Sequence, residues 1–265
     1  NGGANWADVP SSVTGDLKAI HSSGATVIAV GKRVGAASTV AYSTDSGTSW
    51  LSGAVGSDPG EDLKDVTVLS ATVAIAVGKA NGAASTILHT TDSGANWSVL
   101  SLADDPGEDL EKVAANGGTT VIAIGMSGSF VRSTDSGATW SNPIQPGPAA
   151  LLNGIAASGN TVIAVGNQAG NSNIIFSTDQ GSTWLTGTVA ADPLQNLNAV
   201  AVLSATDAVA VGQSVAPPAS TILRTIDSGL NWTVQAVTGD PGRDLLAVAT
   251  SGGTGIAVGL NAGGT

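Results

Sequence analysis

The feature that most constrains the fold of this chain is an eight-residue motif that recurs along its whole length. Every full copy begins with Ser or Thr and has Asp at its third position, Gly at its fifth and Trp at its eighth. The five full copies are STDSGTSW (43–50), TTDSGANW (90–97), STDSGATW (133–140), STDQGSTW (177–184) and TIDSGLNW (225–232). NGGANW (1–6) supplies a sixth, partial copy, so that all six tryptophans end a copy, 43 to 48 residues apart. Repeats that run from end to end share one core, which predicts a single domain over residues 1–265.

Each repeat predicts four short strands. In the repeat that spans residues 61–107, apolar and β-branched stretches separated by turn formers predict strands at 63–69, 73–77, 86–90 and 96–102. With 36 glycines, 10 prolines and no helical periodicity, the whole chain is predicted to be all-β. Four such strands in succession form one antiparallel sheet.

The second strand of the repeat is apolar at almost every position. It recurs as VIAVG (27–31), AIAVG (74–78), VIAIG (121–125), VIAVG (162–166), AVAVG (208–212) and GIAVG (255–259). A strand buried on both faces indicates sheets stacked face to face around an axis, and a period of this length is that of a β-propeller blade. Six repeats therefore predict six blades of four antiparallel strands.

The two ends of the chain are expected to share the closing blade. Residues 1–10 would supply its outer strand, and 245–250 and 255–259 its inner strands. Compared with a full repeat, this blade is one strand short, so we expect the sequence to be part of a longer chain.

The repeated motif predicts a tight turn between the third and fourth strands. Its Asp accepts N–H bonds of the turn, its Gly takes a positive φ, and its Trp packs an apolar surface against a neighbouring strand. We assign this structural role to Asp45, Gly47, Trp50, Asp92, Gly94, Trp97, Asp135, Gly137, Trp140, Asp179, Gly181, Trp184, Asp227, Gly229 and Trp232.

The motif resembles the Asp-box, or BNR repeat, of sialidases and many other propellers. The longer unit, L-x-x-V, then A-V-G, then I-L-x-S/T-x-D-x-G-x-x-W, is similar to bacterial propellers related to the photosystem II stability and assembly factor. In these families the Asp-box is a stabilising hairpin away from the ligand face. The resemblance therefore implies that the repeated Asp residues are not catalytic.

The loops between repeats are the candidate ligand-binding face, together with the loops between second and third strands. They read SDPGEDL (57–63), DDPGEDL (104–110), ADPLQNL (191–197) and GDPGRDL (239–245). One interpretation is a ring of charge that attracts a cation or a basic partner. The plainer interpretation, which we favour, is a repeated Asp-Pro-Gly turn. The candidate residues are Asp58, Glu61, Asp62, Asp105, Glu108, Asp109, Asp240 and Arg243, with Lys32 and Arg33 from the hairpin loop.

Composition excludes several partners. A net charge of −11 with nine Lys and Arg argues against nucleic acid and against an anionic membrane surface, and no basic patch is evident. No apolar run is long enough to insert into a membrane. With no cysteine and only weak calcium signals, we expect no metal and no cofactor. An extracytoplasmic location is expected.

Residue supply argues against an enzyme. A sialidase, as the family implies, needs three clamping arginines and a tyrosine nucleophile; the chain has four arginines, and its one tyrosine, Tyr42, lies beside an Asp-box. A glycosidase that uses two carboxylates stays open, although all tryptophans are committed to the repeats. The side chains directly before the boxes, such as Tyr42, His89 and Phe176, vary, which we interpret as a tolerant outer surface; Phe130 lies on the same kind of strand.

We therefore predict a non-catalytic binding or structural module that contacts a protein or glycan in an extracytoplasmic or cell-surface assembly. The first alternative is an Asp-box glycoside hydrolase with paired carboxylates. The second is an assembly factor for a photosynthetic membrane complex.

Overall fold

The computed structural model is built of β-strands. It describes residues 13–102, 105–141, 144, 151–168, 171–215, 219–240, 242–251 and 253–260, and no helix occurs among them, so none that could cross a membrane. The chain packs as two compact units, residues 1–113 and 114–265, and each is described here by itself. The single domain expected over residues 1–265 stays a prediction.

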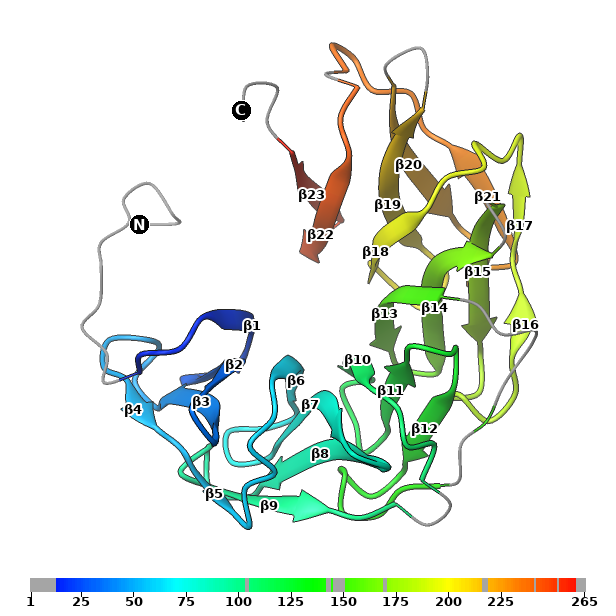
Figure 1. The fold of residues 1–265 in the computed structure, drawn as a ribbon. Coiled ribbons are helices and arrows are strands. Elements are labelled where there is room, and N and C mark those ends of the chain that lie inside the picture. The colour runs from blue at the N-terminus through cyan, green and yellow to red at the C-terminus, as the bar shows by residue number, and fades with distance from the viewer. Residues whose placement is uncertain are drawn as a thin grey trace. The chain divides into compact units, whose positions relative to one another are not determined.

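The first unit holds two sheets (Figure 1). In one, the order is β1-β2-β3-β4, formed by β1 (Leu17–Ser23), β2 (Thr26–Val34), β3 (Ala37–Ser43) and β4 (Leu51–Ser52). In the other, the order is β5-β9-β8-β7-β6, formed by β5 (Ala54–Gly56), β6 (Leu63–Val68), β7 (Ala74–Asn81), β8 (Ala84–Thr90) and β9 (Asn96–Leu100). The four strands predicted between residues 63 and 102 correspond to β6 to β9.

The second unit continues the pattern. It opens with β11 (Val121–Gly125) and β12 (Phe130–Ser133), whose sheet order is β10-β11-β12, and β10 (Leu110–Ala115) begins in the last residues of the first unit. Next come β13 (Leu151–Ser158), β14 (Thr161–Gln168), β15 (Asn171–Ser177) and β16 (Leu185–Thr186) in one sheet. A five-stranded sheet, β17-β21-β20-β19-β18, comprises β17 (Thr188–Ala190), β18 (Leu197–Val202), β19 (Ala208–Val215), β20 (Ala219–Thr225) and β21 (Asn231–Val234). The last sheet pairs β22 (Leu245–Ser251) with β23 (Thr254–Gly259).

Aliphatic side chains fill the space between successive sheets, as the apolar second strands predict. Ile75, Ala76 and Val77 of β7 are fully buried. One core cluster of the first unit joins Ile28 of β2 to Trp97 of β9, and the second unit builds similar clusters. Burial on both faces explains why these strands lack the polar alternation of a half-exposed strand.

The expectation that each repeat forms its own four-stranded sheet is wrong in detail. After Trp50 the chain forms two short strands that belong to different sheets. β4 pairs with β3 of its own sheet, whereas β5 pairs in parallel with β9 of the following sheet. Gly53 lies at the crossing, where an added Cβ would meet the Gly94 carbonyl oxygen at 2.5 Å. A residue without a side chain therefore permits a crossing that strand propensity alone does not predict. The second unit repeats it, with Gly187 between β16 and β17.

The third strands do not present a tolerant outer surface throughout. Phe130 and Phe176 are buried, at 1% and 3% exposure. A Cβ added to Gly229 would lie 2.9 Å from the Cβ of Phe176. A Cβ added to Gly94 would lie equally close to the Cβ of Tyr42. The side chain before one Asp-box is thus covered by the glycine of the next box, which is a tertiary contact and invisible in a single repeat.

Part of the predicted closing blade lies outside the described residues. Its inner strands, expected at 245–250 and 255–259, correspond to β22 and β23. Its outer strand, expected in residues 1–10, and the partial motif there are not among the residues that the structure describes. The number of blades and the closure of the ring stay predictions.

Candidate functional site

The Asp-box side chains are bonded within their own turns. In the first copy, Asp45 Oδ1 accepts bonds from Ser43 Oγ at 2.7 Å and from the Ser49 amide at 2.8 Å, and Trp50 Nε1 donates to the Gly47 carbonyl at 3.1 Å. The other four copies repeat this arrangement. The five glycines have positive φ. These groups hold the turn and offer no free catalytic pair.

Hydrogen bonds stabilise the ionised form of the Asp-box carboxylates. For Asp45, bonds from the Ser49 side chain and amide lower the pKa to about 2. Bonds from Thr139 and from Thr183 likewise lower the pKa values of Asp135 and Asp179 to about 2. A carboxylate whose charged form is favoured in this way is a poor general acid at neutral pH.

The Asp residues of the Asp-Pro-Gly loops bind the hairpin of the preceding sheet. Asp58 accepts bonds from the Ser38 amide at 2.9 Å, the Ser38 hydroxyl at 2.6 Å and the Gly60 amide at 2.8 Å. Asp105 and Asp240 make corresponding bonds to Ser85 and Ser220. These carboxylates join neighbouring repeats.

The second acidic position of these loops is also bonded to backbone. Asp62 accepts from the Arg33 amide at 3.0 Å, and Asp109 accepts from the Ala80 amide at 2.9 Å. The Arg33 guanidinium donates to the Gly60 carbonyl at 3.1 Å. In the second unit, the Arg243 amide donates to the Ser220 hydroxyl at 3.1 Å. Glu61 and Glu108 are half-buried in the same loops. That these residues bind a ligand stays a prediction.

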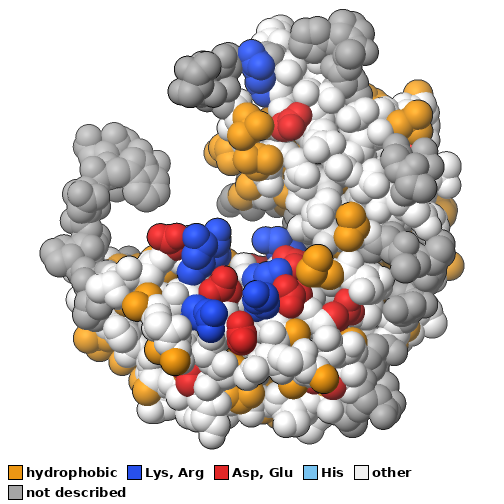
Figure 2. Space-filling model, viewed as in Figure 1, with side chains coloured by type: hydrophobic (Ala, Val, Ile, Leu, Met, Phe, Trp, Pro, Cys, Tyr) orange, Lys and Arg blue, Asp and Glu red, His pale blue; other side chains and the backbone are white. Residues whose placement is uncertain are grey.

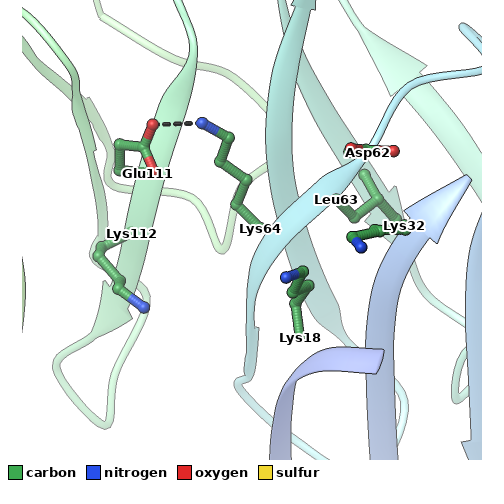
Figure 3. A pocket seen from close by; sticks show the side chains of 7 residues that line it. All are labelled: Lys18, Lys32, Asp62, Leu63, Lys64, Glu111 and Lys112. Atoms are coloured by element: carbon green, nitrogen blue, oxygen red, sulfur yellow. Dashed lines mark hydrogen bonds and ion pairs between the residues drawn. The ribbon is translucent and has the colours of Figure 1, made fainter. Parts of the chain in front are cut away.

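A hollow of about 420 Å³ in the first unit brings together side chains that the sequence did not single out (Figure 3). It is lined by Lys18, Lys32, Asp62, Leu63, Lys64, Glu111 and Lys112. Two of these residues, Lys32 and Asp62, were candidates from the sequence. Figure 2 shows the same concentration of basic and acidic side chains on the visible face of the first unit. Both signs of charge meet in this region, so it does not contradict the expectation of no basic patch.

Two of the four lysines in this hollow are neutralised. Lys32 Nζ lies 2.8 Å from Asp16 Oδ2, in an exposed ion pair that raises the pKa of Lys32 and lowers that of Asp16. Lys64 Nζ lies 2.9 Å from Asp109 Oδ2 and also pairs with Glu111. Among the described residues, Lys18 and Lys112 have no carboxylate within ion-pair distance.

Polar side chains beside this hollow connect successive inner strands. His21 Nδ1 of β1 accepts the Val68 amide of β6 at 3.0 Å, and Asp65 Oδ2 of β6 accepts the Val113 amide of β10 at 3.0 Å. Burial lowers the pKa of His21 and raises that of Asp65. Each first strand lies at the edge of its sheet, where some backbone N–H groups have no partner strand. His21 and Asp65 accept hydrogen bonds from two of these N–H groups.

The lysines were missed because each is unremarkable within its own repeat. Lys18 and Lys64 directly follow the Leu that opens a first strand, and Lys112 comes one position later in its repeat. An alignment of the repeats on that Leu would have placed them in one region. Within the described residues, no group of three or more His, Asp or Glu side chains is arranged to hold a metal.

The comparisons with known proteins show the type of fold. Residues 27–156 match the model of the family described as photosynthesis system II assembly factor YCF48. No curated protein matches the chain.

Three solved structures illustrate the likeness in fold. A structure of YCF48 bound to D1 peptide is 16% identical, with a TM-score of 0.59 over 95% of this chain and 91% of that chain. YCF48 from Cyanidioschyzon merolae is 16% identical, with a TM-score of 0.56 over 97% and 96%. The GH74 xyloglucanase from Xanthomonas campestris is 15% identical, with a TM-score of 0.59 over 83% of this chain but 38% of its own. The chain therefore has a β-propeller type of fold and is similar to the photosystem II assembly factor YCF48.

Proposed function

We propose that this chain is a non-catalytic, protein-binding assembly factor, which acts by holding a segment of a subunit of a membrane complex. The observation that carries the proposal is the match of residues 27–156 to the YCF48 assembly-factor model. The YCF48 structures support it, because they align along nearly the whole of both chains, and one of them is bound to D1 peptide. A protein partner is accordingly favoured over a glycan.

The finer parts of the proposal concern form and place. We propose that the repeats form one propeller of six blades, supported by five full Asp-boxes and six apolar second strands. We also propose an extracytoplasmic location. Limited proteolysis of the intact protein tests the first part: a closed ring should resist cleavage between residues 113 and 114, whereas two independent domains should separate there.

The carboxylates offer little support for the glycosidase alternative. A glycosidase needs one carboxylic acid with a raised pKa and a second carboxylate close by. Asp58 and Asp240 instead accept bonds from backbone amides and a serine hydroxyl, and Asp105 accepts bonds from two backbone amides. The pKa of Asp65 is raised by burial, but its carboxylate is committed to the Val113 amide.

Calorimetric titration with the D1 peptide of the YCF48 complex tests the proposed function. We expect saturable binding at micromolar concentration, no binding of a scrambled peptide, and no release of reducing sugar from xyloglucan. Absence of peptide binding would contradict the proposal, and xyloglucan hydrolysis would favour the glycosidase.

A further inference from the structure

Three Asn-Gly pairs lie in the described part of the chain, at Asn81–Gly82, Asn116–Gly117 and Asn153–Gly154. The side-chain amide of asparagine is open to attack by the backbone nitrogen of the next residue. Glycine favours this attack because it has no side chain to block the approach and its backbone is the most flexible. The dipeptide is the same in all three cases, so a difference in reactivity between them depends on the fold.

Asn81–Gly82 lies at the tip of the β7–β8 hairpin, where Asn81, Gly82, Ala83 and Ala84 are all exposed. Asn81 pairs with Ala84, and a register shift between Gly78 and Asn81 separates this pair from the rest of the ladder. No atom beyond the adjacent residues lies within 4 Å of the position that a Cβ on Gly82 would take. The tip can therefore open locally while the sheet stays intact.

The other two pairs are held more firmly. Both ends of the Asn116 amide are bonded to backbone groups, at 2.9 and 3.0 Å. Asn153 lies within β13 and donates to a carbonyl of the next inner strand at 2.9 Å, and Gly154 after it is buried. Asn81 Nδ2 makes one exposed bond, to the Pro59 carbonyl at 3.2 Å. The fold thus leaves the amide of Asn81 the most accessible of the three.

The hairpin turn does not require asparagine at this position. The β2–β3 hairpin has the same following residues, GAAST at 35–39 and at 82–86, and both turns have their glycine at a φ of +64°. Val34 takes the place of Asn81 there and pairs with Ala37 in the same way. Asn81→Val is therefore a substitution that the fold should accept.

We propose that Asn81 is a site of spontaneous deamidation, which replaces its side-chain amide by a carboxylate. The Gly82 nitrogen gives up its proton to hydroxide and attacks Cγ of Asn81. The new C–N bond closes a five-membered imide, while Nδ2 leaves as ammonia and takes a proton from water. Water then opens the ring at either carbonyl carbon, which gives aspartate or isoaspartate. Water is the only other reactant consumed, and nothing is oxidised or reduced.

The conversion changes both a hydrogen bond and the charge beside the hairpin. A carboxylate cannot donate to the Pro59 carbonyl, so the bond between the Asp-Pro-Gly loop and the hairpin is lost. Asn81 also lines a second hollow of about 420 Å³, together with Asp58 and Asp105. Deamidation adds a further negative charge to this hollow, in a chain whose net charge is already −11.

Peptide mapping of the intact folded protein, incubated at pH 8 in water enriched in oxygen-18, tests the proposal. The heavy oxygen marks carboxylates that form during the incubation, and electron-transfer fragmentation distinguishes isoaspartate from aspartate. Asn116 and Asn153 are internal controls in the same molecule. Asn81→Val is the matched variant, and a parallel incubation in urea removes the fold.

We expect isoaspartate to accumulate at Asn81 in the folded protein, and more slowly at pH 6 than at pH 8, because the attacking nitrogen must lose a proton. Conversion at Asn116 should be about tenfold slower, since a further hydrogen bond has to open first. In urea the three pairs should react at similar rates, and Asn81→Val should leave this peptide unchanged. Equal rates at the three pairs in the folded protein, or aspartate without isoaspartate at Asn81, would overturn the proposal.

Discussion

The same position of the repeat is used differently in the two units. Directly after the first-strand Leu that pairs with the Gly of the second strand, the second unit places Asn153 and Asn198. Their amides donate at 2.9 and 2.8 Å to carbonyls of the next inner strand. The first unit places Lys18 and Lys64 there, and Lys64 pairs with carboxylates instead. On β13 and β18 the second unit thus uses the position to connect its strands, although Leu246 occupies it on β22, whereas the first unit places a charged side chain there.

The difference extends to what joins the inner strands. In the first unit the joining groups are His21 and Asp65, which titrate, and in the second they are Asn153, Asn198 and Thr250, which do not. The same scaffold thus accommodates both titratable and neutral side chains at these contacts. Four predictions test how far the two units differ.

The largest loss of stability is expected at a contact that both units share, between an Asp-box glycine and the aromatic residue before the preceding box. Gly94→Ala and Gly229→Ala each place a Cβ at 2.9 Å from the Cβ of Tyr42 or Phe176, at φ of +98° and +107°. Strain and overpacking together should cost more than about 2 kcal/mol of unfolding free energy in either unit. Gly47→Ala is the control, because the φ of Gly47 is +86° but the nearest atom to an added Cβ would be Trp50 Cζ2, at 3.9 Å. Urea unfolding measures all three, and equal losses would show that the contacts do not matter.

The second prediction contrasts the two kinds of inner-strand residue. Asn198→Ala leaves the Leu245 carbonyl without its side-chain donor and should lower the unfolding free energy by about 1–2 kcal/mol. Lys18→Ala should change it by less than about 0.5 kcal/mol, because Lys18 is exposed. Hydrogen exchange followed by mass spectrometry locates each effect. A larger loss of stability for Lys18→Ala than for Asn198→Ala would contradict this contrast between the units.

The third prediction concerns acid. Because the pKa values of Asp45, Asp135 and Asp179 are lowered to about 2 from 3.8, the unfolded chain binds more protons between these values. Their contribution to stability is present above about pH 4 and is lost as pH falls toward 2. Both units carry such an Asp, so both should weaken together, as tryptophan fluorescence in urea can measure. Asp179→Asn should reduce the pH dependence, and a flat profile from pH 5 to 2 would refute the prediction.

The smallest effect should be confined to the first unit. Burial lowers the pKa of His21 below 6.5, with Asp65 opposing, so the neutral ring that accepts the Val68 amide is favoured. The contribution of neutral His21 to the free energy of unfolding is present above about pH 6.5 and declines as pH falls through the lowered pKa. Amide exchange at Val68, measured by NMR after correction for intrinsic rates, should become less protected at pH 5.5 than at pH 7.5.

A matched variant and an opposing group sharpen this last test. His21→Gln should remove the change at Val68, and a change of equal size in β18 would contradict its restriction to the first unit. Asp65 acts in the opposite direction at lower pH. Because its pKa is raised above 3.8, its contribution increases as pH falls through the raised value.

The repeat and its strands can be predicted from the sequence alone. Period, turn formers and apolar runs place β6 to β9 within a few residues of their observed bounds, because these signals are local to one repeat. The repeated motif also predicted the positive φ of the Asp-box glycines and the hydrogen bonds from each turn to its own Asp. Each of these depends on residues close together in the chain.

The contacts between repeats, in contrast, depend on the tertiary structure. The crossing of β5 to β9 depends on Gly53 meeting Gly94, and the burial of Phe176 depends on Gly229. The lysine-lined hollow needs Lys18, Lys64 and Lys112, which are 46 and 48 residues apart in sequence, to come together. The physical reason is that a repeat specifies its own hydrogen bonds, whereas charge and packing depend on side chains that the stacking of sheets brings into contact.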